Sequence, residues 1–331
     1  MKVIVTGATG FLGHWLVKRL TEEGHEVHAL VRPKSDVSEL KGLEFKSVFG
    51  DVTDKESLLS AFQEIDTVFH LAGVIAYKPS DRPLMEKVNI HGTANVLAAI
   101  QACRVRKLVH LSSVVAVGAG FTPNDILNEK SVYNVSHLNL GYFETKRAAE
   151  QLVLHAFQKN QIDPVILNPS TIYGAGDAKK GSRKTQIKVA RGEFKFYTPG
   201  GVNVVDVEDV VEGILKAWKV GRSGERYILS GENMTIKDLF QKIADAAGVQ
   251  APKTELPRSV LRIIGALGDL GQSFGLKTPI SSENAWTSTL YHWFDSSKAR
   301  TELGFQSRPA QEAIQKSVLW MKENSYLDAT Q

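Results

Sequence analysis

The stretch TGATGFLG at residues 6–13 constrains most strongly what this chain can fold into. It follows a short β-rich run, Lys2–Thr6, and opens a helical pattern, Phe11–Glu23, so Gly7, Gly10 and Gly13 stand at a turn from strand to helix. The first glycine permits the tight turn, the second lets a diphosphate approach the backbone, and the third lets the helix pack against the sheet. The helix start then offers unpaired N–H groups to the phosphates. We therefore expect a dinucleotide-binding turn rather than a purely structural one.

Strand and helix patterns alternate along the first half of the chain. Strands are expected at residues 2–6, 26–31, 45–49, 67–71, 107–112 and 164–167, and helices at residues 11–23, 54–63, 85–103 and 142–159. Strands separated by helices predict a parallel sheet with right-handed crossovers. The expected fold class is α/β, with a doubly wound parallel Rossmann sheet over residues 1–168. Residues 169–331 are expected to form mainly a smaller, interleaved substrate lobe, with some segments returning to the sheet.

Composition limits the classes of protein that fit. The 331 residues carry a net charge of +4 without a long Lys/Arg block, so nucleic acid is not an expected partner. No apolar run approaches the ~18 residues that span a bilayer, so no stable membrane insertion is expected. The single cysteine, Cys103, excludes internal disulfides and suits a reducing compartment, and a cytoplasmic location is expected. No set of metal ligands is assigned.

A basic loop follows the second expected strand. Counting about 20 residues from Gly13 reaches Arg32, where NAD-binding Rossmann folds carry an acid for the ribose 2′-hydroxyl. No acid lies between Glu26 and Asp36. A guanidinium can bind a 2′-phosphate through a fork of donors, and Lys34 would add a second charge. We therefore expect NADP(H) as the preferred cofactor, with NAD(H) as the second choice; a solvated basic loop is the alternative interpretation.

The glycine spacing T-G-x-x-G-x-x-G resembles that of the extended short-chain dehydrogenases/reductases, the NAD-dependent epimerase/dehydratase superfamily. Other stretches fit the same family in order along the chain: HLAG at residues 70–73, a serine pair at residues 112–113, Tyr-x-x-x-Lys at residues 142–146 and NPSTIYGAGD at residues 168–177. The dihydroflavonol-4-reductase-like branch is the most similar. The cofactor-binding residues expected from the turn, the basic loop and this resemblance are Gly7, Thr9, Gly10, Phe11, Leu12, Gly13, Arg32, Lys34, Asp51, Val52, Leu71, Ala72, Gly73, Tyr142, Lys146, Pro169 and Ser170.

Three residues form the expected catalytic group. Tyr142 and Lys146 lie four residues apart, hence on one helical face, and they follow the glycine turn and the strand-end serines in the order of the family. Reducing a carbonyl by hydride builds negative charge on its oxygen, so the site needs a positioned proton donor. The resemblance implies that Tyr142 is the acid/base group, that Lys146 favours tyrosinate and holds the nicotinamide ribose, and that Ser113 orients the substrate oxygen. Ser113 is preferred to Ser112 because of its spacing from Gly118.

Several valines distinguish this chain from sugar-handling members of the family. Val114 and Val115 stand where dehydratases carry an Asp-Glu pair. Val117 replaces a common tyrosine, and Val202 aligns with an arginine that grips the diphosphate of a sugar nucleotide. These changes make the pocket more apolar. The expected function is therefore an NADPH-dependent reductase of a small, fairly apolar aldehyde or ketone, with an NAD(P)-dependent sugar epimerase and a non-catalytic NADP(H)-binding sensor as alternatives.

The second half of the chain is harder to interpret. Ile75, Val114 and Tyr173 are the expected substrate contacts. The apolar stretch Arg258–Leu276 fits core packing, a pocket lid or a membrane-surface helix, and core or lid is favoured because its basic face is thin. A basic cluster at residues 179–184 is interpreted as a solvated loop, with an anionic-substrate site as the alternative. A homodimer through the helices at residues 85–103 and 142–159 and a monomer both remain open.

Overall fold

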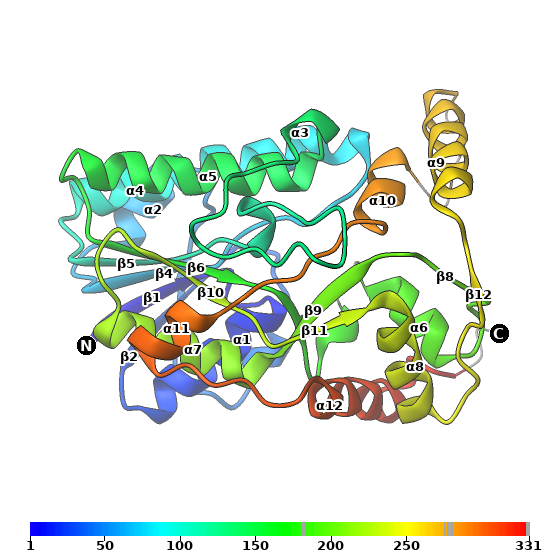
Figure 1. Ribbon diagram of the computed structural model, residues 1–331. Helices are drawn as coiled ribbons and strands as arrows, with labels where there is room; N and C mark the ends of the chain where they lie inside the picture. The colour runs from blue at the N-terminus through cyan, green and yellow to red at the C-terminus, as the bar shows by residue number, and fades with distance from the viewer. Residues whose placement is uncertain (180–182, 275, 277, 279–280, 329–331) are drawn as a thin grey trace.

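A seven-stranded parallel sheet organises the chain (Figure 1). The computed structural model describes residues 1–331 except 180–182, 275, 277, 279–280 and 329–331. The strands, in their order across the sheet, are β10 (Arg226–Leu229), β6 (Pro164–Pro169), β5 (Lys107–Leu111), β4 (Thr67–His70), β1 (Lys2–Thr6), β2 (Glu26–Val31) and β3 (Lys46–Phe49). The strand order reverses between β1 and β4, which is the switch point of a doubly wound fold. The predicted fold class is confirmed.

Helices cover both faces of this sheet (Figure 1). Val3 and Val5 point to one face and Ile4 to the other, as alternation along a strand requires, and all three are buried. The helices on the first face are α1 (Phe11–Glu22), α7 (Val207–Val220) and α11 (Ser297–Leu303). Those on the second face are α2 (Lys55–Ala61), α4 (Gly92–Ala102) and α5 (Gly141–Gln158). Since α7, β10 and α11 all come after residue 169, the second half of the chain does contribute to the sheet domain.

The helix expected at residues 85–103 is divided in the structure. A short α3 (Arg82–Met85) leads into a π-helical segment, Glu86–His91, and α4 begins only afterwards. Inside this segment the Asn89 amide accepts from the Val74 N–H at 2.8 Å and donates to the Val74 carbonyl at 3.0 Å. The wide turn thus fixes the chain that follows β4, and such turns are frequent near functional sites.

A smaller lobe lies beyond the carboxyl ends of the main-sheet strands, where β7 (Thr171–Tyr173) follows β6 and β11 (Glu232–Thr235) follows β10 (Figure 1). Its strands are β7, β9 (Gly201–Asp206) and β11, with a separate pair, β8 (Phe196–Tyr197) and β12 (Thr254–Glu255). Its helices are α6 (Lys184–Ala190), α8 (Ile236–Ala247), α9 (Arg258–Ser273), α10 (Ser282–Thr287) and α12 (Ala310–Glu323). Residues of β7, β9, α8 and α12 share one buried apolar core. The sequence did not predict the three-stranded sheet.

Helix α9 projects from the body of the molecule beside α10 (Figure 1). Its inner face is packed: Leu261 is buried, and a Cβ on Gly265 would lie 2.9 Å from Ser282 Cα. Its other side exposes large apolar residues, among them Ile263 and Leu267. Core packing therefore describes only the inner face of this stretch, and the pocket lid, the other favoured interpretation, stays a prediction. No helix in the described part of the chain has the length and apolar character needed to cross a membrane.

Candidate active site

The predicted site residues gather at the carboxyl edge of the main sheet. Thr6 at the end of β1 is level with Leu30 in β2 and with His70 at the end of β4, and His70 is level with His110 in β5. The segments that follow these four strands therefore leave the sheet side by side. In open α/β sheets, this edge at the switch point is where ligands bind.

The glycine turn packs directly on the segment after β4. Gly7 has φ +71°, and a Cβ there would lie 2.8 Å from the Ala72 nitrogen. A Cβ on Gly13 would lie 2.1 Å from the Gly7 carbonyl oxygen, so a side chain fits at neither position. Gly10 is the N-cap of α1, and no side chain caps this helix. The N-terminal N–H groups thus remain for a ligand, and the turn fits the diphosphate of a dinucleotide.

A buried polar network holds the turn and the segment after β4 together. The Thr6 hydroxyl accepts from the Ala72 N–H at 3.1 Å and lies 2.8 Å from His70 Nδ1. His70 Nε2 in turn lies 3.1 Å from the Thr93 hydroxyl. Burial lowers the pKa of His70 to about 3, with a smaller effect from the Lys146 ammonium. His70 is therefore a neutral packing residue that positions the backbone of Leu71, Ala72 and Gly73.

Tyr142, Lys146 and Ser113 lie together at this edge. The Lys146 ammonium donates to the carbonyl of Leu111, the last residue of β5, at 2.8 Å, and a Cβ on Gly73 would lie 3.9 Å from Lys146 Nζ. Burial raises the pKa of Tyr142, and a hydrogen bond with Ser113 acts in the opposite direction. The other serine of the pair, Ser112, is buried. These contacts support Ser113, rather than Ser112, as the residue that would orient the substrate oxygen.

A buried carboxylate connects these residues to the edge of the sheet. Glu150 follows Lys146 by one turn of α5; it accepts from Arg226 at 3.0 Å and from the Asn168 amide at 2.7 Å. Asn168 also donates to the Ser113 carbonyl at 2.9 Å. Burial lowers the pKa of Lys146 to about 8, and the Glu150 charge opposes this shift. Glu150 was not among the predicted site residues, although its i, i+4, i+8 spacing with Tyr142 and Lys146 is a signal that identifies it.

Two further residues around Tyr142 come from distant parts of the chain. A Glu283 carboxylate oxygen of α10 accepts from the Tyr142 N–H at 3.4 Å, at the uncapped N-terminus of α5. Burial raises the pKa of Glu283, and backbone hydrogen bonds from Tyr142 and Gly141 oppose that effect. The Tyr77 ring meets the Tyr142 ring edge-on at 6.1 Å between centroids, and burial raises its pKa to about 12. No local sequence pattern identifies either residue.

The predicted cofactor residues after β2 and β3 differ in their surroundings. Arg32 and Lys34 are both exposed just beyond the carboxyl end of β2. Asp51 is engaged locally, since its carboxylate accepts from the Thr53 N–H at 2.8 Å and from the Thr53 hydroxyl at 2.9 Å. Val52 is buried in the apolar cluster between the sheet and α4. Arg32 and Lys34 are therefore available to a ligand, whereas Asp51 already closes a turn.

The other predicted cofactor residues lie along α1 and after β6. Leu12 is buried in the core, so only its backbone can face a ligand, while Thr9 and Phe11 are partly exposed. Pro169 ends β6, and the hydroxyl of buried Ser170 is 2.5 Å from Asn203 Oδ1. Ser170 is thus tied to β9 of the smaller lobe.

The basic cluster at residues 179–184 is only partly a solvated loop. Arg183 is buried and lies 3.2 Å from the Asp177 carboxylate, with its guanidinium 3.9 Å from the Tyr173 ring centroid. The solvated-loop interpretation is wrong for Arg183, and Lys180 lies outside the described residues. Tyr173 is itself buried in the lobe core beneath Arg183. A substrate contact by this tyrosine remains a prediction.

The two valines after Ser113 enter different clusters. Val115 packs in the apolar cluster that contains Tyr142, Met85 and Leu290, whereas Val114 packs with a separate group that includes Phe294. Val115 thus shares its cluster with Tyr142, and a substrate contact by Val114 stays a prediction. Ile75 is exposed in the segment that follows Gly73, and Val202 is buried in the lobe core.

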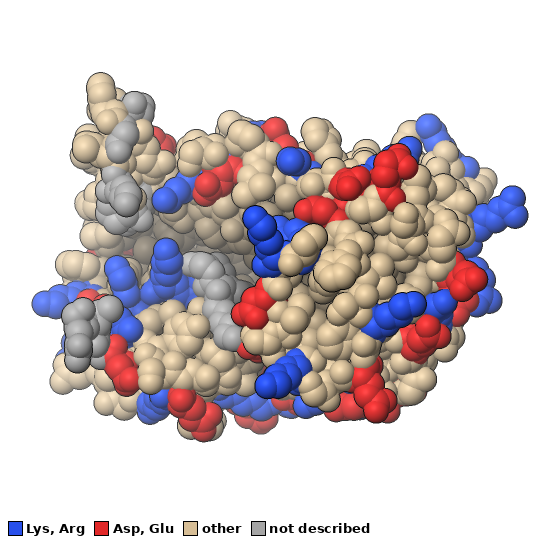
Figure 2. Space-filling view, turned by 180° about the vertical axis from the view of Figure 1, so that it is seen from behind, with Lys and Arg blue, Asp and Glu red and all other residues tan. Residues whose placement is uncertain are grey.

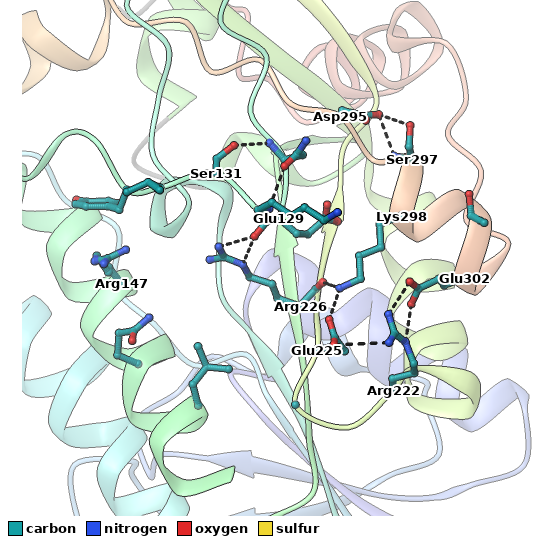
Figure 3. A pocket seen from close by; sticks show the side chains of 18 residues that line it. Glu129, Ser131, Arg147, Arg222, Glu225, Arg226, Asp295, Ser297, Lys298 and Glu302 are labelled. Carbon is teal, nitrogen blue, oxygen red and sulfur yellow. Dashed lines mark hydrogen bonds and ion pairs between the residues drawn. The ribbon is translucent and has the colours of Figure 1, made fainter. Parts of the chain in front are cut away.

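A cavity of about 960 Å³ lies elsewhere, between α5, β10 and α11 (Figure 3). Its charged side chains pair with one another: Arg222 contacts Glu302 at 2.7 Å, and Lys298 contacts Glu225 at 2.5 Å. It is lined by Arg147 on α5 but by neither Tyr142 nor Lys146. This cavity is therefore separate from the candidate active site.

Comparisons with known proteins agree with this arrangement. Residues 3–230 match the model of the NAD dependent epimerase/dehydratase family. A Synechocystis protein named for dihydroflavonol 4-reductase is 32% identical over 98% of this chain and 95% of its own length. The sterol demethylase protein B of Methylococcus capsulatus is 30% identical over 99% of this chain and its full length. The crystal structure of gox2253 superposes with a TM-score of 0.88, at 33% identity over 99% of both chains. The chain therefore belongs to the NAD-dependent epimerase/dehydratase family of extended short-chain dehydrogenases/reductases, and its recognition as an oxidoreductase of this family is confirmed.

Proposed function

We propose that this protein is an NADPH-dependent reductase of a small, fairly apolar aldehyde or ketone. The observation that carries the proposal is the convergence of Ser113, Tyr142 and Lys146 beside Gly73 at the carboxyl edge of the sheet. Each contact brings a group required for carbonyl reduction to one place: a proton donor, a fixed cation and a hydroxyl that can hold the substrate oxygen.

Each part of the site has its own role in the proposed reaction. A reduced nicotinamide dinucleotide, when bound, supplies a hydride to the carbonyl carbon. The Gly7–Gly13 turn and the start of α1 would hold its diphosphate. Tyr142 donates its phenol proton to the carbonyl oxygen, so that an alcohol forms, while Ser113 orients that oxygen by a hydrogen bond. The Lys146 ammonium stabilises the tyrosinate left behind, which is needed because burial raises the pKa of Tyr142.

The preference for NADPH rests on Arg32 and Lys34. Both side chains are exposed beyond β2, near the turn that would hold the diphosphate. A 2′-phosphate placed there meets two cations and no neighbouring carboxylate on the same loop segment, residues 27–35. A guanidinium also matches phosphate through paired N–H donors.

The apolar substrate class rests on the residues packed around Tyr142. Val115, Met85 and Leu290 share its cluster, and none of them can transfer a proton or bind a diphosphate. The names of two relatives, one for a flavonoid reductase and one for a sterol-processing protein, point the same way. A reducing, cytoplasmic setting is part of the proposal, since Cys103 is the only cysteine.

The deciding experiment is NADPH oxidation with a panel of aldehydes and ketones of increasing apolar size. A reductase consumes NADPH and forms alcohol in equal amounts. A sugar epimerase, the second candidate from the family, would convert nucleotide sugars without net loss of NADPH. Tyr142→Phe should abolish the turnover while leaving NADPH binding intact; turnover unchanged in this variant would contradict the mechanism. A protein that binds NADPH but turns over neither class would fit the non-catalytic sensor.

A further inference from the structure

Helix α9 carries two arginines on the side that meets aromatic rings of its neighbours. Arg258 and Arg262 lie four residues apart, hence on one side of the helix. The Arg262 guanidinium is 4.1 Å from the Trp286 ring centroid, and the Arg258 guanidinium is 6.0 Å from the Tyr291 ring centroid. Both cations are therefore held against rings of the segment 282–291.

The position over a ring leaves most N–H groups of this arginine pair available. A guanidinium is attracted to a ring face, and its five N–H donors point outward in the plane of the group. Arg258 donates one of them to the Pro199 carbonyl at 3.5 Å. Among the residues that the structure describes, no carboxylate lies within ion-pair distance of either arginine. Arginine binds carboxylate and phosphate oxygens through paired N–H groups, so the pair fits an oxyanion.

Apolar side chains connect the arginine pair to the proposed reaction site. Trp286, which lies under Arg262, packs against the apolar cluster that contains Tyr142, and Leu290 is buried in that cluster. The segment is also fixed to the start of α5, because the Glu283 carboxylate accepts from the Tyr142 N–H at 3.4 Å. An apolar wall thus runs from Tyr142 to the arginines on α9.

Positive charge gathers around a hollow beside α9. Figure 2 shows the projecting helix from behind, at the upper left, and a hollow at its foot with Lys and Arg side chains around it. In the sequence, residues 178–200 hold seven Lys and Arg residues and one acid, Glu193. Burial raises the pKa of Tyr77 to about 12, and Arg183 of this basic segment is close enough to oppose that shift. A basic surface around a hollow favours the approach of an anionic ligand.

We propose that Arg258 and Arg262 bind a terminal oxyanion of the substrate, a carboxylate or a phosphate at the far end of an apolar chain or ring. The inference rests on the proposed reductase function and adds the group that is recognised away from the carbonyl. The carbonyl lies at Tyr142, the apolar body lies along Trp286 and the oxyanion lies at the arginine pair. The two arginines are then specificity-determining residues rather than catalytic ones.

NADPH oxidation with matched aldehydes tests the proposal. The series contains ω-oxo carboxylates of increasing chain length, their methyl esters and the corresponding ω-oxoalkyl phosphates. At the best length, the wild type should show a kcat/KM for the carboxylate or the phosphate about tenfold or more above that for the ester, as a charged hydrogen bond provides. The two anionic arms show which oxyanion is preferred. Arg262→Gln should remove most of this preference by raising KM, with little change for the ester.

Two further variants separate recognition from structure. Arg262→Lys keeps the charge without the paired donors, so it should restore part of the preference for the anion. The matched control is Arg147→Gln, since the Arg147 guanidinium also lies over a ring, 4.3 Å from the Tyr133 centroid, but lines the separate cavity. This control should leave the preference intact. Equal kcat/KM for anion and ester at every length, or an Arg262→Gln variant that slows both equally, would overturn the proposal.

Calorimetric binding of octanoate and octanol distinguishes this proposal from the reductase function itself. Neither ligand has a carbonyl that hydride could reduce, so the measurement does not depend on turnover. The wild type should bind octanoate about tenfold or more tightly than octanol, and Arg262→Gln should remove the difference. If no carbonyl compound oxidises NADPH while octanoate still binds through Arg262, the reductase function is wrong and the oxyanion site stands. Octanoate binding that Arg262→Gln leaves unchanged would overturn the site, whatever the turnover.

Discussion

Lys146 and Glu150 lie one turn apart on α5 with both side chains buried, and the Glu150 carboxylate opposes the burial that lowers the Lys146 pKa to about 8. The same carboxylate binds Arg226 and Asn168, so it is held in place from two other strands. The charge of the proposed catalytic lysine therefore depends on a residue that the substrate does not need to touch. This dependence makes Glu150 a positioning residue in the proposed mechanism.

Replacing Glu150 by Gln should move the pH profile of the reductase reaction. Without the carboxylate charge, the pKa of Lys146 falls further, so the ammonium is lost at lower pH. We expect the alkaline limb of kcat/KM to move down by about one pH unit. The matched control is Glu144→Gln on the same helix, because Glu144 contacts Tyr133 and not Lys146. An unmoved limb in the Glu150 variant would show that Lys146 is not tuned by this carboxylate.

Replacing Lys146 by Met should change how stability depends on pH. The folded pKa of about 8 lies below the ordinary value of 10.5, so the unfolded chain binds more protons between these limits. Stability of the wild type therefore gains from Lys146 as pH rises from about 8 to 10.5. The free energy of unfolding of the variant minus that of the wild type should therefore be most positive below pH 8. It should fall by on the order of 3 kcal/mol between about pH 8 and pH 10.5.

Urea unfolding at several pH values measures this difference. Lys188→Met, at an exposed position on α6, serves as the control and should give a difference that does not vary with pH. A constant difference for Lys146→Met as well would mean that the ammonium is not desolvated in the folded enzyme.

Glu283 links the smaller lobe to the start of the catalytic helix. Glu283→Ala removes the acceptor for the Tyr142 N–H and should lower the free energy of unfolding by about 1 kcal/mol, as loss of an N-terminal cap does. Glu283→Gln keeps an acceptor and should cost less. Because Tyr142 is then held less firmly, we expect kcat to fall more than KM rises in the alanine variant. Urea unfolding and steady-state kinetics on both variants check this; equal stability of the two variants would exclude the capping role.

The sequence predicted those parts of the site whose signals are local. The glycine turn joins consecutive elements, β1 and α1, and Tyr142 and Lys146 share one helix, so spacing alone identifies them. Glu283 lies 141 residues from Tyr142, and its role depends on how the lobe packs. The different surroundings of Val114 and Val115 were not predictable for a related reason: the tight turn at Val114–Ala116 sends adjacent side chains into different clusters, and no alternation pattern reveals this.

The lobe was predicted less well than the sheet domain for a physical reason. Apart from the exposed edge strand β3, the strands of the main sheet are largely buried on both faces and contain apolar runs, which are visible in a single sequence. Strand β7 has only three residues, β11 is only partly buried, and β9 contains the buried polar residue Asn203. Asn203 is satisfied by Ser170, Gly231 and Asn233, none of which is near it in sequence.

Arg32 provides the sharpest test of the cofactor. Binding of a ligand to the folded state stabilises it by mass action, so thermal shifts at equal concentrations rank NADPH against NADH. The wild type should shift more with NADPH. Arg32→Ala should weaken NADPH binding about tenfold or more, as loss of a charged hydrogen bond does, and leave the NADH shift unchanged. Lys34→Ala should have a smaller effect, because an ammonium lacks the paired donors of a guanidinium. The exposed Lys41→Ala, beyond this loop, is the control. A larger shift with NADH, or an NADPH shift that survives Arg32→Ala, would assign the loop no role in recognising the 2′-phosphate.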